Sequence, residues 1–148
     1  MKYIFLILIS FLFANVIAQN LTRADAKKIL FRTNRVIYAS VASVKNTENF
    51  TGDLSQAHAY QKFAITFFRK GLFTKSVYHS LYARKKAENS IKLNKGNMPM
   101  EANLDSKENA FFLSSPSKES LIKEFYESHI AVIKEEQLIK SKLKINIE

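Results

Sequence analysis

The sequence contains no cysteine and no tryptophan, and it has only three glycines and two prolines among its 148 residues. The absence of cysteine excludes disulfide bonds and thiolate metal ligands, so packing alone must hold any core. So little glycine and proline excludes a collagen-like chain and a Gly/Pro-rich disordered chain. A hydrophobic content of 47%, with 12 Phe and 6 Tyr, fits one small globular domain.

The longest apolar run lies at the start of the chain. Residues 3–13 are apolar apart from one serine, and they follow a single lysine. A membrane-spanning helix needs about 20 apolar residues, whereas this shorter run is typical of a signal peptide, with Val16 and Ala18 as the small residues before a cleavage site. We therefore expect residues 1–18 to be a signal peptide and the mature chain to be exported, either to the periplasm or outside the cell. An uncleaved membrane anchor is the alternative.

Charge is distributed unevenly along the chain, whose formal net charge is +10. Residues 19–95 contain 15 basic and four acidic side chains, whereas residues 96–148 contain seven basic and nine acidic ones. The two parts could attract one another within one molecule or between molecules. The positive excess permits an acidic partner without identifying one.

Apolar residues recur at steps of three and four, which predicts an all-α protein of about four helices around a central antiparallel hairpin. We expect residues 19–95 to form a basic domain of three helices, the first of them over residues 22–45. Residues 96–116 lack a sustained period and are rich in Ser, Asn and charge, which favours a linker. Residues 117–148 are expected to form one C-terminal helix that carries the apolar positions Leu121, Ile122, Phe125, Val132, Ile133, Ile139 and Leu143.

Helix ends are indicated by residues that can cap them. Thr22 and Asp25 have the spacing of a capping box, and Asp53 or Ser55 could accept the first free amide hydrogens of the second helix. Gly71 can end that helix in the left-handed conformation that glycine tolerates. Thr74 could then cap the third helix.

Residues 57–87 carry small and aromatic side chains at the spacing of a tetratricopeptide repeat: Ala64, Phe67, Gly71, Phe73, Ser76 and Ala83. The resemblance implies two short antiparallel helices that interlock around small residues. The chain departs from the repeat at Ser80, where a large residue is usual, and it shows no second copy. The same pattern resembles HEPN hairpins, although Arg69 and His79 are further apart than in their ribonuclease members. The whole chain resembles small uncharacterised exported helical proteins of Bacteroidetes, which implies location and no activity.

Signals for catalysis and metal binding are sparse. His58, His79 and His129 fall on three different predicted helices, an arrangement that could converge on a metal ion in a bundle. No His pair stands at a ligand spacing, so we predict partly buried or surface histidines and no metal. Neither a nucleophile elbow nor a Gly-rich phosphate loop is present. We therefore predict no cofactor and no enzymatic activity.

The most suggestive surface feature is a basic stretch at the end of the predicted third helix. It comprises Arg84, Lys85, Lys86, Lys92 and Lys95, and it follows Tyr78 and Tyr82. Cations interleaved with aromatic rings can bind anionic polymers, so these five basic residues form a candidate anion-binding site. A solvated helix face with tyrosines inside and lysines outside gives the same pattern.

These observations together predict an exported, non-catalytic helical protein that acts as a protein-interaction or scaffolding module in the cell envelope. Its expected partner is another envelope or secreted protein, and no small-molecule substrate is indicated. The alternative is an electrostatic binder of an anionic polymer or a membrane surface. Salt separates the two functions, because binding through a basic stripe weakens steeply as the salt concentration rises.

Overall fold

A computed structural model describes residues 21–148, and the predicted signal peptide lies outside this range. The described part is all-helical, as the apolar periodicity predicts, with six α-helices and one short 3-10 helix and no strand between residues 21 and 148. The elements are α2 (Arg23–Thr47), α3 (Asp53–Arg69), α4 (Phe73–Leu93), η2 (Met100–Ala102), α5 (Ser106–Leu113), α6 (Lys118–Glu127) and α7 (Glu135–Lys140). No helix within residues 21–148 is both long and apolar enough to cross a membrane.

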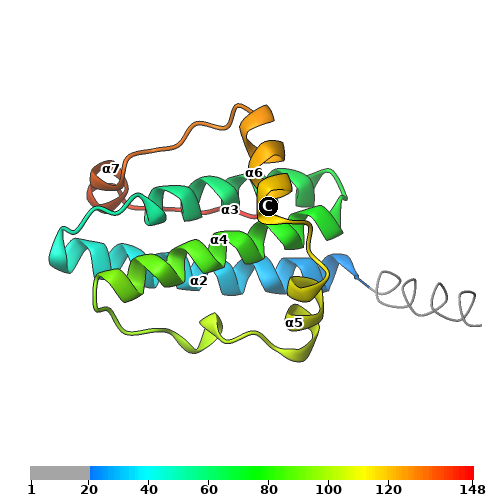
Figure 1. The fold of residues 1–148 in the computed structure, drawn as a ribbon, viewed down its shortest axis with the longest axis horizontal. Coiled ribbons are helices and arrows are strands. Elements are labelled where there is room, and N and C mark those ends of the chain that lie inside the picture. Colours follow the sequence, from blue (N-terminus) through cyan, green and yellow to red (C-terminus); the bar gives the residue numbers. More distant parts are fainter. Residues whose placement is uncertain (1–20) are drawn as a thin grey trace, which may run out of the picture.

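The three long helices α2, α3 and α4 lie side by side and form the body of the molecule (Figure 1). Their apolar stripes face one another, because residues at steps of three and four share one side of a helix. Leu30 on α2, Phe68 on α3 and Leu81 on α4 meet in one buried cluster. The apolar residues at helical spacing along these helices are mostly buried, with Val41 and Tyr78 only partly so.

The residues predicted to cap the N-terminal ends of the long helices are confirmed for α2 and wrong for α3 and α4. Thr22 and Asp25 form the expected capping box at the start of α2. Gly52 stands at the N-cap of α3, and no side chain of Asp53 or Ser55 caps this helix. The Leu54 amide donates instead to Glu135 Oε1 at 2.7 Å, a carboxylate 81 residues further along the chain. Thr74 likewise caps nothing, because Leu72 holds the N-cap position of α4.

Gly71 reverses the chain between α3 and α4. Its φ is +75°, a left-handed conformation that side chains with a Cβ rarely adopt, so this prediction is confirmed. A methyl group at this position would contact nothing within 4 Å. The requirement for glycine here is therefore conformational rather than steric.

Residues 96–116 contain η2 and α5, and α5 packs against α4 (Figure 1). Phe111 of α5 joins the core, and Glu108 of the same helix is almost fully buried. Glu108 Oε1 accepts a hydrogen bond from Arg84 Nη2 at 2.8 Å, inside the molecule. This buried ion pair holds the segment against the helical body.

The single helix predicted for residues 117–148 is wrong. The helix that begins at Lys118 ends at Glu127, and His129 has a φ of +54°, so α6 and α7 are separate helices. The Ser128 hydroxyl donates a hydrogen bond to the Phe125 carbonyl and accepts one from the Ile130 amide. The run of β-branched residues that follows also disfavours a helix. Residues 128–148, here called the C-terminal strap, arch over α3, form α7, and return as an extended tail between α2 and α3 (Figure 1).

Candidate functional site

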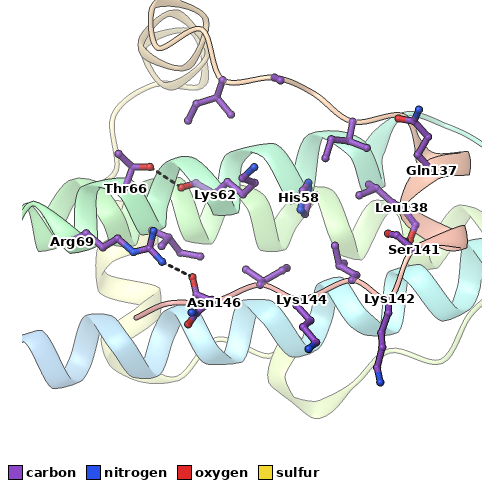
Figure 2. A pocket seen from close by; sticks show the side chains of 16 residues that line it. His58, Lys62, Thr66, Arg69, Gln137, Leu138, Ser141, Lys142, Lys144 and Asn146 are labelled. Atoms are coloured by element: carbon purple, nitrogen blue, oxygen red, sulfur yellow. Dashed lines mark hydrogen bonds between the residues drawn. The ribbon is translucent and has the colours of Figure 1, made fainter.

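A groove of about 690 Å³ lies between α3 and the C-terminal strap (Figure 2). His58, Lys62, Thr66 and Arg69 line it from α3, and the strap supplies the opposite wall from residues 130–146. The residues on α3 recur at steps of three and four, so they share the helix face that the strap crosses. The volume lies within the usual range of ligand pockets.

The strap is fixed to the helical body at both ends of the groove. At one end, Glu135 of α7 accepts the Leu54 amide at the start of α3, where the helix dipole favours a negative charge. At the other end, Arg69 Nη2 donates to the carbonyl of Asn146 at 3.2 Å and to that of Glu148 at 2.9 Å (Figure 2). These contacts fix the strap at both ends of the groove and leave the space between its two walls open.

The charged residues that line the groove are all cations: Lys62, Arg69, Lys142 and Lys144. Within the described residues 21–148, Lys62, Lys142 and Lys144 form no ion pair, and Arg69 bonds the main-chain oxygens of Asn146 and Glu148. The Lys142 and Lys144 side chains extend away from α3, whereas their backbone faces the groove (Figure 2). Apolar side chains also line the groove, among them Ile65, Ile133 and Leu138.

His58 is the buried polar residue of the groove. Its side chain is 5% exposed, and its Nδ1 atom has no hydrogen-bond partner among residues 21–148. Burial, with a smaller contribution from the nearby Lys62 ammonium, lowers the pKa of His58 to about 4. At neutral pH the imidazole is therefore uncharged.

A second, smaller cavity of about 250 Å³ lies where α6 meets α4. Glu124 of α6 accepts hydrogen bonds there from Lys75 Nζ at 2.5 Å and pairs with His79 Nε2 at 2.9 Å. Burial opposes ionisation of Glu124, but these two bonds outweigh it and keep the pKa of the carboxyl below its usual value. Burial lowers the pKa of His79, which packs against the rings of Tyr60, Phe63 and Phe67. The cluster fastens α6 to the hairpin.

The structure does not bring the five residues of the predicted basic stretch together at one surface. Arg84 is 1% exposed, and its guanidinium contacts Glu108, Thr33 and the Ile29 carbonyl inside the molecule. Lys85 lies 3.9 Å from Glu88. A replacement of Arg84 would therefore report on folding rather than on anion binding.

The other three residues of that stretch have different surroundings. Lys86 pairs with Asp53 at 3.0 Å. Lys92 and Lys95 are exposed, and neither has an ion pair within residues 21–148. Lys92 thus provides a solvated cation of the kind that the sequence predicted for the whole stretch.

The three histidines lie apart. His58 lines the groove, His79 lines the second cavity, and His129 is exposed in the strap. In the part of the chain that the structure describes, no group of three or more His, Asp or Glu side chains is placed to hold a metal ion.

Sequence reasoning missed the groove, because its two walls come from segments about 80 residues apart. One signal could have indicated the tail. Leu143, Ile145 and Ile147 alternate with polar residues, the period of an extended segment rather than of a helix. Ile147 is 2% exposed and joins the core, as that alternation implies.

Compared with family models, curated proteins and solved structures, the chain gives no significant match to any of them.

Proposed function

We propose that the mature chain is an exported binding module that holds an acidic segment of a partner protein in the groove between α3 and the C-terminal strap. The observation that carries the proposal is Lys62, a cation on the α3 wall of the groove that has no ion pair within residues 21–148, in a lining whose charged residues are all cations. Several other surface cations are paired with acids of the same chain. An unpaired cation beside apolar side chains complements a ligand with carboxylates on one side and apolar side chains on the other.

A protein segment fits the groove better than a polymer or a membrane surface. Among residues 21–148, no Phe, Tyr or Trp lines the groove, whereas bases are bound largely by stacking on aromatic rings. A lipid headgroup layer is broad and needs an exposed basic face, whereas Lys62 borders a concave space roofed by the strap. The anionic polymer and the membrane surface are therefore alternative outcomes of the same binding experiment.

The experiment uses residues 19–148 and two fluorescent acidic peptides. One alternates Glu with Val and favours an extended conformation, and the other places Glu and Leu on opposite faces of a helix. Heparin and vesicles that contain phosphatidylglycerol serve as the alternative probes. We expect at least one peptide to bind more tightly than heparin or the vesicles, as measured by fluorescence anisotropy and co-sedimentation.

The decisive variant is Lys62→Glu, with Lys92→Glu as its matched control. Both lysines are exposed on a long helix and lack an ion pair among the described residues, and both replacements change the net charge equally. Reversing a charge beside a bound carboxylate replaces an attraction by a repulsion, so we expect about tenfold weaker peptide binding for Lys62→Glu. The control should change the affinity less than about twofold.

Equal losses for the two variants would show that overall charge attracts the peptide, and would overturn the proposal. Loss for Lys92→Glu alone would favour the basic stretch predicted from the sequence. Binding of heparin or vesicles with no binding of either peptide would favour the anionic polymer or the membrane surface.

A further inference from the structure

The tail of the strap presents one edge of its backbone to α2. Ile145 donates its amide to the Tyr38 hydroxyl at 3.1 Å, and its carbonyl accepts from Asn34 Nδ2 at 3.3 Å. Tyr38 and Asn34 are four residues apart on α2, so both lie on the helix face beside the tail. Both polar backbone groups of Ile145 are thus satisfied on the same side.

The opposite edge faces α3 and the groove. In an extended chain, successive residues direct their N–H and C=O groups to opposite sides. The contacts of the tail follow this rule, because Asn146 and Glu148 direct their carbonyls to Arg69 of α3. Lys144 belongs to the same set, two residues before Asn146, and its backbone lines the groove.

The backbone of this edge is largely unpaired. Within residues 21–148, neither the N–H nor the C=O of Lys144 has a hydrogen-bond partner, and the Asn146 amide has none. An unpaired edge of an extended segment is a template on which another extended chain can pair. The groove on that side has space for such a chain, and its wall opposite the tail carries Lys62.

From this geometry we infer that the acidic partner segment binds in an extended conformation and pairs as a β-strand with residues 144–146 of the tail. The inference rests on the proposed function and specifies its binding mode. Because side chains of a strand alternate, the partner would direct one set toward Ile65 and Leu138 and the other toward Lys62. A segment of alternating acidic and apolar residues matches that requirement.

The first test removes the Lys144 amide hydrogen without changing the fold of the three long helices. Lys144→Pro lacks this N–H, and Lys144→Ala keeps it while losing the same charge. We expect about tenfold weaker binding of the alternating Glu/Val peptide to the proline variant than to the alanine variant. Equal affinities, with equal melting temperatures, would overturn strand pairing.

The second test leaves the protein unchanged, so a poorly folded variant cannot obscure it. Two versions of the Glu/Val peptide carry N-methyl groups on alternate residues, one on each edge of the strand. We expect one methylated version to lose binding to the wild-type chain and the other to keep it, because only one edge pairs with the tail. Equal affinity of the two versions, or tighter binding of the helical peptide, would overturn the inference.

The two proposals fail differently. If a peptide binds and Lys62→Glu weakens it, but neither methylation nor Lys144→Pro matters, the groove still binds an acidic segment and only strand pairing is wrong. If neither acidic peptide binds, or Lys62→Glu has no effect, both proposals are wrong.

Discussion

Two basic regions of this molecule differ in whether their cations are paired with carboxylates of the same chain. Four of the six cations of α2 each lie near a carboxylate from residues 101–148: Lys27 with Glu148, Lys28 with Asp105, Arg32 with Asp105 and Glu108, and Arg35 with Glu101. In the groove between α3 and the strap, Lys62 has no ion pair within the described residues. The paired cations stabilise the fold, and we propose that Lys62 binds a ligand.

The comparison shows why a count of charges along the sequence gives no site. The basic residues 19–95 and the mildly acidic residues 96–148 do attract one another, and within this structure they do so inside one molecule. In the sequence, Arg84 belongs to the basic stretch that we expected at the surface. In the structure it pairs with Glu108, 24 residues away, and both side chains are buried. Where positive charge remains unbalanced depends on the tertiary structure.

The largest effect should come from a cation of the paired set. Arg84→Gln breaks a buried ion pair and leaves Glu108 with only Arg32 as a charged partner, so we expect about 3 kcal/mol lower free energy of unfolding. Urea denaturation measures it. The neighbouring Lys85→Gln is the control, because an exposed pair at 3.9 Å should contribute less than about 0.5 kcal/mol. Similar losses for the two variants would contradict the structural role of Arg84.

Acidification should lower the free energy of unfolding more through the buried His58 of the groove than through the ion pairs of α2. The pKa of His58 is about 4 in the folded chain and 6.5 in the unfolded one, so only the unfolded state binds this proton between those values. The contribution of His58 is fully present above pH 6.5 and is lost progressively toward pH 4, by up to about 3 kcal/mol. His79 acts in the same direction, because burial lowers its pKa as well.

Urea denaturation at pH 7 and at pH 4.5 measures this loss, and His58→Gln isolates the share of His58. The variant should lose less stability on acidification than the wild type. If both lose the same amount, His58 is not held neutral by the groove.

The smallest expected change in stability is at an unpaired cation. Lys62→Gln removes a charge that has no ion-pair partner within residues 21–148, so we expect a stability change below about 0.5 kcal/mol. The same replacement should raise the pKa of His58, because Lys62 disfavours its protonation. An NMR titration of the imidazole measures the shift, with Lys92→Gln as the control. An unchanged pKa would place Lys62 too far away to act on the groove.

Much of the fold could be predicted from the sequence, because α2, α3 and α4 follow local rules. Their apolar residues recur at helical spacing, Thr22 and Asp25 cap the first, and Gly71 supplies the left-handed turn. The C-terminal region could not be predicted so well. Its shape depends on contacts far along the chain, such as the Glu135 carboxylate that caps α3.

The candidate site was not predictable from the sequence. The excess of cations permits an acidic partner without identifying one, and the candidate anion-binding residues fell mainly on α4, where Arg84 is buried and Lys86 is paired. The groove depends on the strap crossing α3, and no local pattern encodes that crossing. The alternation of Leu143, Ile145 and Ile147 is the one local feature that indicates how the strap ends.

The most direct test of the central claim maps the alternating Glu/Val peptide onto the whole molecule. In a titration of the ¹⁵N-labelled chain, residues 19–148, the peptide should shift amide resonances of residues 62–69 and 141–146. The exposed side of α2 and the region of Lys92 and Lys95 should stay unchanged. Shifts confined to α2 or to Lys92 and Lys95, with the groove unaffected, would contradict the assignment of the binding site to the groove.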